Sequence, residues 1–154
     1  MHERLKENVL ETMETDLIIF DLDGTLIDSS EDIALAANRV LADLGHTKMD
    51  SDRVKEGIGW GVKTLLEKMM PGEGAERIEY ARMKFLEYYW ENTVVNTYLY
   101  KGVRETIDYF SLINKKMAVV TNKPIKYTEK ILTELALSRY FNLIIGGDSL
   151  QNRK

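Results

Sequence analysis

The chain contains no cysteine among its 154 residues. Disulfide bonds and thiolate chemistry are therefore excluded, and the composition is compatible with a reducing compartment, so we expect a cytoplasmic protein. Histidine is almost as scarce, because only His2 and His46 are present and they lie far apart in the sequence. A zinc site built on imidazole ligands is therefore not expected.

Long apolar runs and an excess of basic residues are missing as well. No apolar stretch approaches the roughly 20 residues of a membrane-spanning helix, and the first residues are too polar for a signal peptide. The 21 lysines and arginines are outnumbered by 25 acidic residues, which gives a formal net charge of −4. This balance argues against nucleic acid as a partner, and we expect no membrane partner either. A small phosphorylated metabolite remains possible, because a local site in an acidic protein can be positive.

What the chain does have is a short unbroken apolar run, Leu17–Phe20, followed at once by Asp21 and Asp23. The run predicts a strand buried on both faces, as in a parallel sheet. Gly24 then allows a sharp turn and the close approach of a ligand. Because ligands of open α/β sheets bind beyond the carboxyl ends of the strands, the acidic pair lies where a ligand would bind. Carboxylates without histidine or cysteine nearby suit a hard cation such as Mg²⁺.

Two other interpretations of this stretch compete with a magnesium site. An acidic turn after a strand is often no more than a turn. A calcium-binding loop would also begin with two aspartates at this spacing, but its invariant glycine would fall on Leu26 and its closing glutamate on Asp32. It would also follow a helix rather than a strand. The calcium loop is therefore rejected, and the plain turn stays as the alternative.

The second half of the chain alternates between strand and helix patterns. Met117–Val120 and Leu143–Ile145 are short apolar runs that predict two more buried strands. Helical spacing of apolar residues predicts helices over residues 102–113 and 127–137. Strands that alternate with helices predict an α/β fold with a Rossmann-like core of three parallel strands and right-handed crossovers.

Residues 30–96 show only helical patterns, and we interpret them as an all-helical insertion. Helices are predicted from about residue 30 to a stop at Gly45, and over 51–56, 62–70 and 75–92, with a glycine-rich loop at Gly57–Gly61. The α/β core is then discontinuous and comprises residues 16–29 and 97–154. Residues 1–15 carry apolar residues at helical spacing and form either an amphipathic helix or a disordered arm.

Residues 21–29 (Asp-Leu-Asp-Gly-Thr-Leu-Ile-Asp-Ser) resemble the first motif of the haloacid dehalogenase (HAD) superfamily. Asp23 is similar to the second aspartate of its phosphatase branch, and the chain as a whole is most similar to phosphoglycolate-phosphatase-like members. The resemblance implies Mg²⁺-dependent hydrolysis of a phosphate monoester of a small metabolite. It also implies that residues 30–96 form a helical cap over the active site.

The resemblance assigns roles to residues of the first motif. Asp21 would be the nucleophile that forms an aspartyl-phosphate, and Asp23 the general acid and base. Mg²⁺ would be held by the Asp21 side chain and the backbone carbonyl of Asp23. Gly24 and Thr25 would lie against the substrate.

Four further polar residues are candidates for phosphate or substrate binding. Thr121 and Asn122 follow the strand at 117–120, so they should face the same crevice as Asp21. Thr121 also resembles the phosphate-binding residue of the family's second motif. The common alternative is that Thr121 caps the following helix. Lys154 resembles the lysine of the third motif, and its alternative is a solvated tail lysine. Lys63 follows the glycine-rich loop and would meet an anionic part of the substrate, unless that loop is an ordinary connection between helices.

The chain departs from the family in one respect. Members have a fourth motif, a later strand with further aspartates that complete the Mg²⁺ site, and this sequence stops before it. We therefore expect a fragment of a longer phosphatase, in which the strand at 17–22 has an unpaired edge and is prone to aggregation. The alternative function is a truncated, non-catalytic phosphate-binding or interaction module of the same fold.

Overall fold

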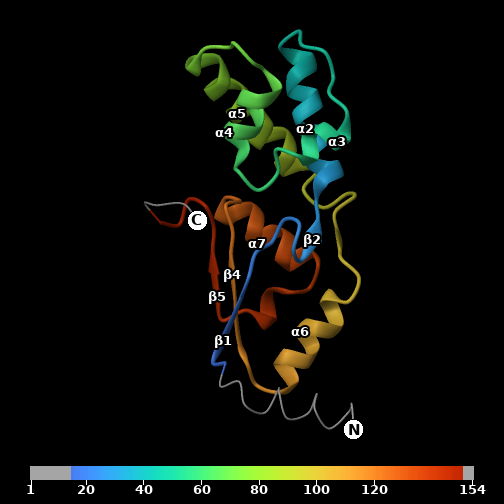
Figure 1. Ribbon diagram of the computed structural model, residues 1–154, viewed down its shortest axis with the longest axis vertical. Helices are drawn as coiled ribbons and strands as arrows, with labels where there is room; N and C mark the ends of the chain where they lie inside the picture. Colours follow the sequence, from blue (N-terminus) through green and yellow to red (C-terminus); the bar gives the residue numbers. More distant parts are fainter. Residues whose placement is uncertain (1–14, 151–154) are drawn as a thin grey trace, which may run out of the picture.

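The structure is a computed structural model that describes residues 15–150 (Figure 1). The elements in chain order are β1 (Leu17–Phe20), β2 (Ile27–Asp28), α2 (Ser30–Asp43), α3 (Ser51–Lys55), α4 (Val62–Met69), α5 (Ala75–Glu91), β3 (Tyr98–Leu99), α6 (Val103–Leu112), β4 (Lys116–Val120), α7 (Ile125–Glu134), the 3₁₀ helix η1 (Ser138–Tyr140) and β5 (Leu143–Ile145). Figure 1 shows α2 to α5 grouped at one end of the molecule and the sheet with α6 and α7 at the other.

The predicted parallel sheet of three strands is confirmed. Its order is β1-β4-β5, and both pairings are parallel. Ile19 pairs with Ala118, which in turn pairs with Leu143, so these side chains share one face of the sheet. The opposite face, which carries Met117 and Val119, is buried against α6 and α7.

The prediction that the first strand is buried on both faces is wrong. Leu17 and Ile19 are 45% and 58% exposed, and Leu143, in the same row as Ile19, is 53% exposed. Ile18 and Phe20, which point the other way, pack against the buried cluster of the sheet. The reason is that α6 and α7 both cover one face, and within residues 15–150 the Ile19 face stays open to solvent.

A two-stranded antiparallel ribbon joins the two ends of the molecule. β2 pairs with β3 through Ile27 with Leu99 and Asp28 with Tyr98, and the Tyr100 N–H donates to the Leu26 carbonyl at 3.1 Å. The chain leaves the sheet region through β2 and returns through β3. The sequence did not predict this ribbon, because strands of two residues carry no periodicity that could reveal them.

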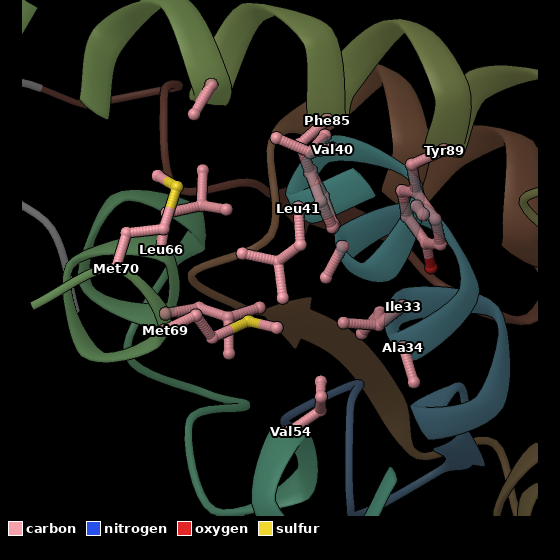
Figure 2. Packing of buried hydrophobic residues seen from close by; sticks show 14 of the residues in the cluster. Ile33, Ala34, Val40, Leu41, Val54, Leu66, Met69, Met70, Phe85 and Tyr89 are labelled. Carbon is pink, nitrogen blue, oxygen red and sulfur yellow. The ribbon is translucent and has the colours of Figure 1, made fainter. Parts of the chain in front are cut away.

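Helices α2, α4 and α5 enclose a hydrophobic cluster of their own. Figure 2 shows Leu41 from α2, Leu66 from α4 and Phe85 from α5 packed together, and Val54 of α3 also belongs to the cluster. The predicted helices within residues 30–96 are confirmed to within one or two residues at their ends. No helix described within residues 15–150 has the length and apolar character needed to cross a bilayer.

The helix predicted over 127–137 is shifted toward the N-terminus. Pro124 is the N-cap of α7, and the helix ends before Ala136, which adopts a positive φ of 54°. Its first turn carries Tyr127 into the hydrophobic cluster of the other helices rather than into that of the sheet. The Tyr127 hydroxyl donates to the Leu86 carbonyl of α5 at 2.7 Å, so α7 holds the two ends of the molecule together.

Candidate active site

A small cavity lies where the carboxyl ends of β1 and β4 meet the helical end of the molecule. Its sheet-side wall contains Asp21, Asp23 and residues 121–124, and its other wall contains residues of the 57–62 loop together with α4 and α5. The cavity has a volume of about 50 Å³. Because a water molecule needs roughly 10–15 Å³, the cavity has room for a few small groups.

A tight turn after β1 places the two aspartates. The Leu22 carbonyl accepts hydrogen bonds from the N–H groups of Thr25, Leu26 and Ile27, at 2.9 to 3.2 Å, while the Leu22 side chain is fully buried. Gly24 has a φ of +79°, a conformation that favours glycine. The buried Leu22 thus anchors the turn, and the flanking Asp21 and Asp23 are held at the cavity, as predicted.

Gly24 and Thr25 lie differently from the two aspartates. Both are exposed, and neither lines the cavity that contains Asp21. Gly24 instead lines a neighbouring hollow with Ser29 and Lys55. Their predicted contact with the substrate therefore stays a prediction.

The most strongly buried charges of the site are Asp23 and Lys123, which form an ion pair. The Lys123 Nζ lies 3.0 Å from both carboxylate oxygens of Asp23, and the side chains are 5% and 10% exposed for the lysine and the aspartate. The Ser29 hydroxyl donates to the same carboxylate at 2.5 Å. Burial opposes the charge on Lys123, but the attraction of Asp23 outweighs it and raises the pKa of the lysine above its ordinary value.

Sequence reasoning missed Lys123 and chose other cations. Lys154 lies outside the described residues. Lys63 does not line the cavity, and its Nζ lies 3.9 Å from a Glu67 oxygen on the same helix. The signal that could have identified Lys123 is its position two residues after Thr121, in the polar run that follows a buried strand.

Thr121 and Asn122 lie in the cavity wall, at the carboxyl end of β4 as predicted. The Thr121 N–H donates to the Ile145 carbonyl, and its hydroxyl oxygen accepts from the Lys123 N–H at 3.2 Å. The alternative of Thr121 as the cap of α7 does not hold, because Pro124 takes that position.

Asn122 connects the sheet to the glycine-rich loop. Its Nδ2 donates to the Gly59 carbonyl at 2.9 Å, which places the 57–61 loop over the cavity. Its Oδ1 is buried, and no hydrogen-bond partner for it is found among residues 15–150. A buried acceptor without a partner is uncommon in folded proteins.

Two glycines after β5 fix the backbone of this wall. A Cβ at Gly147 would lie 2.2 Å from the Asn122 carbonyl oxygen, and one at Gly146 would lie 2.4 Å from the Ile125 nitrogen. The Gly147 N–H donates to the Lys123 carbonyl at 2.9 Å. The loop that carries Thr121, Asn122 and Lys123 therefore packs backbone to backbone on β5, which only glycine permits.

Tyr89 contributes the other wall from α5. Its side chain is almost fully buried, and Lys123 is the polar neighbour of its hydroxyl. The Lys123 Nζ lies 4.8 Å from the centre of its ring. Burial raises the pKa of Tyr89, so the hydroxyl keeps its proton and can donate it in a hydrogen bond.

The donor set for a metal ion is small. Asp21 and Asp23 offer hard oxygen atoms, and residues 15–150 contain no group of three or more Asp, Glu, His or Cys side chains arranged to hold a metal. Mg²⁺ commonly binds through one or two carboxylates together with water and substrate phosphate. The residues present therefore fit Mg²⁺ bound with its substrate, and not a cation in a cage of protein ligands.

Comparison with known proteins agrees with this geometry. Residues 18–154 match the haloacid dehalogenase-like hydrolase family. The chain is 44% identical over 138 residues to a phosphoglycolate phosphatase of Aquifex aeolicus, with 90% of this chain and 63% of that protein covered. It is 34% identical over 152 residues to the phosphoglycolate phosphatase of Colwellia psychrerythraea, with 94% and 67% covered.

Solved structures give the same result. The crystal structure of a predicted phosphoglycolate phosphatase from Haemophilus somnus superposes with a TM-score of 0.86 at 32% identity, and covers 93% of this chain and 67% of that one. The match to the phosphoglycolate phosphatase 1 of Pseudomonas aeruginosa covers 53% of the length of that protein. The chain thus spans between about half and two thirds of the length of these relatives.

Proposed function

The chain belongs to the haloacid dehalogenase-like hydrolase family, and on this premise we propose that it hydrolyses the phosphate monoester of a small metabolite similar to phosphoglycolate. The observation that carries the proposal is the convergence of Asp21, Asp23, Thr121 and Lys123 on one small cavity. The reaction would pass through an aspartyl-phosphate on Asp21 with Mg²⁺ as cofactor.

In the first step a carboxylate oxygen of Asp21 forms a bond to phosphorus, and the bond between phosphorus and the ester oxygen breaks. Carboxylates are generally ionised near neutral pH, so this nucleophile needs no base to activate it. To act as the acid, Asp23 must first take up a proton and leave its ion pair with Lys123; it then transfers this proton to the leaving oxygen. Water then attacks phosphorus, Asp23 takes up its proton, and the Asp21 carboxylate is released with inorganic phosphate.

The remaining residues would bind and orient the phosphate. The Thr121 hydroxyl lies in the same wall and is a suitable donor to a phosphate oxygen. Lys123 and Ser29 fix the Asp23 carboxylate from two sides, so that it is oriented for proton transfer. Mg²⁺, held by the Asp21 carboxylate and the Asp23 carbonyl, would supply positive charge that offsets the repulsion between the nucleophile and the phosphate.

We further propose that residues 16–29 and 97–154 form the core and residues 30–96 a cap. Two separate hydrophobic clusters support this division, one among α2 to α5 and one beside the sheet. The cap residues in the cavity wall, such as Ile58 and Tyr89, would exclude water from the reacting atoms.

The proposal is tested by turnover of 2-phosphoglycolate and of an aryl phosphate with Mg²⁺. We expect Asp21→Asn to lower kcat by more than about a thousandfold, because it removes the nucleophile. Asp52→Asn, an exposed carboxylate in α3, is the matched control and should retain full activity. Removal of Mg²⁺ with a chelator should also stop turnover. No turnover by the parent chain would instead favour a non-catalytic phosphate-binding module.

A further inference from the structure

A second hollow adjoins the small cavity on the side of Asp23. Asp23 and Ile58 line both spaces, and the second hollow also contains Gly24 and Lys55. Its volume is about 210 Å³, against about 50 Å³ for the cavity that contains Asp21. The proposed chemistry at Asp21 does not by itself give this larger hollow a function.

The sizes of the two spaces indicate how a phosphate ester would lie across them. At roughly 10–15 Å³ for a water molecule, the cavity beside Asp21 holds about four groups of that size, which is enough for a phosphoryl group and little more. In the proposed reaction Asp23 transfers a proton to the leaving oxygen, so the organic part of the ester must begin beside Asp23. The second hollow is lined by the same Asp23 and has the room that the organic part needs.

Lys55, the last residue of α3, is the one basic residue that lines the second hollow within residues 15–150. Its ion pair in that part of the chain is with Asp52, whose oxygen lies 3.8 Å from the Lys55 Nζ and whose side chain is 91% exposed. Such a pair is screened by water and contributes little. A lysine ammonium has three N–H donors, so Lys55 keeps donors for a ligand in the hollow.

Asp28 lines the same hollow, but its oxygens are occupied by other donors. They accept from the Ser30 N–H at 3.0 Å, from the Ser30 hydroxyl at 2.5 Å and from the Tyr98 hydroxyl at 3.2 Å. These hydrogen bonds lower the pKa of Asp28, and the Lys55 ammonium adds a smaller lowering. Because the Asp28 charge remains in the hollow, a ligand group with one negative charge suits Lys55 better than a second phosphate with two.

We propose that Lys55 determines substrate specificity by binding a carboxylate on the organic part of the phosphate ester. This inference rests on the proposed phosphatase function. The phosphoryl group would lie beside Asp21 and Thr121, the ester oxygen beside Asp23, and the carboxylate beside Lys55 in the second hollow. The substrate class is therefore short phosphorylated hydroxy acids, in preference to neutral or cationic esters of the same size.

The test compares Lys55→Met with the parent chain on three esters of similar length. These are 2-phosphoglycolate with a carboxylate, 2-phosphoglycolamide as its neutral counterpart, and 2-aminoethyl phosphate with a cationic group. We expect kcat/KM for 2-phosphoglycolate to fall about tenfold, the loss of one hydrogen bond between charged groups, and for the amide to change by less than about twofold. The tenfold loss should shrink as salt is added, because the Lys55 side chain is half exposed.

Arg53→Met is the matched control for Lys55→Met. Arg53 is an exposed basic residue of the same short helix, and it lines neither the cavity nor the second hollow. Its replacement removes the same charge, so it should leave the preference for 2-phosphoglycolate over the amide unchanged. An equal loss of preference in both variants would trace the effect to net charge and overturn the inference.

Charge reversal gives an independent readout. Lys55→Glu should raise kcat/KM for 2-aminoethyl phosphate relative to 2-phosphoglycolate, because the group that faces the ligand changes sign. A half-exposed residue at the end of a helix tolerates either substitution, so both variants should fold. Equal loss on all three esters, no loss on any, or an unchanged order of preference in Lys55→Glu overturns the inference.

A binding measurement separates this inference from the proposed function. Binding of 2-phosphoglycolate and of its amide with Mg²⁺ is measured by calorimetry on Asp21→Asn and on the same protein with Lys55→Met added. If the parent chain hydrolyses neither ester but Lys55→Met still weakens binding of 2-phosphoglycolate selectively, the proposed catalysis fails and the assignment of Lys55 stands. If the parent chain hydrolyses both esters and Lys55→Met changes neither binding nor turnover selectively, the proposed function stands and the inference fails. No binding of either ester also overturns the inference.

Discussion

At the scale of single residues, the Asp23–Lys123 pair is the feature on which the site depends most. Both charges are almost completely buried, and each satisfies the other at 3.0 Å. Removing one partner from such a pair leaves an uncompensated charge, which costs far more than the pair contributes as a whole. An exposed pair of similar geometry, Lys84 with Glu87 at 2.9 Å, is screened by water and contributes little.

We therefore expect Lys123→Met to lower the free energy of unfolding by about 3–5 kcal/mol near neutral pH, as measured by urea denaturation. Lys84→Met is the matched control and should leave the free energy of unfolding almost unchanged, because its ion pair is exposed to solvent. The double variant Asp23→Leu with Lys123→Met should recover much of the loss but have no phosphatase activity. A double variant as unstable as the single one would show that burial of an unpaired charge is not the cause.

At the scale of elements, Asp32 joins the start of α2 to the segment that returns to the sheet. Its side chain is fully buried, and its oxygens accept from the backbone N–H groups of Val95, Asn96 and Thr97 at 2.8 to 3.1 Å. The Thr97 hydroxyl adds a further bond at 2.7 Å. One carboxylate therefore fixes both chain crossings between the sheet and the helical end of the molecule.

We expect Asp32→Asn to lower the free energy of unfolding by about 3 kcal/mol, because the amide NH₂ would face N–H groups that now donate to a carboxylate. Asp52→Asn is the control, since Asp52 lies in the first turn of α3 and its side chain is 91% exposed. Denaturation by urea measures both changes. Equal stability of the two variants would contradict a structural role for Asp32.

The elements that the sequence predicted are those with internal periodicity. α2, α4, α5 and α6 have apolar residues at helical spacing, and the strands β1, β4 and β5 are apolar runs, so each could be identified from its own residues. The ribbon of β2 and β3 could not, because its hydrogen bonds join residues about seventy positions apart. The role of Asp32 was missed for the same reason, since its partners are distant in sequence.

At the scale of the whole molecule, some residues of the candidate site could be predicted from the sequence and others could not. Asp21 and Thr121 could be predicted together, because the carboxyl ends of parallel strands meet at one edge of a sheet. Tyr89 could be assigned only to the core of the helical insertion, since nothing in its helix pattern shows that its side chain lines the cavity. Lys123 lies in the predicted polar run, but its pairing with Asp23 depends on how the β4 loop packs on β5.

The uncovered face of the sheet is the other feature that belongs to the whole molecule. Ile19, Ala118 and Leu143 form a row across the three strands, and the two large side chains of the row are more than half exposed. Within residues 15–150, β1 pairs only with β4, so its second edge has no partner strand there. An apolar face beside an unpaired strand edge is the arrangement that promotes association between copies.

We therefore expect the chain to self-associate with rising concentration and Ile19→Lys to shift it toward the monomer, as measured by sedimentation velocity. The lysine places a charge at the centre of the exposed row, where burial against another copy would require its desolvation. Leu112→Lys is the matched control, because Leu112 is 79% exposed on α6, away from the sheet face, and should leave the association unchanged. If both variants sediment like the parent chain at every concentration, the Ile19 face is not the surface of association.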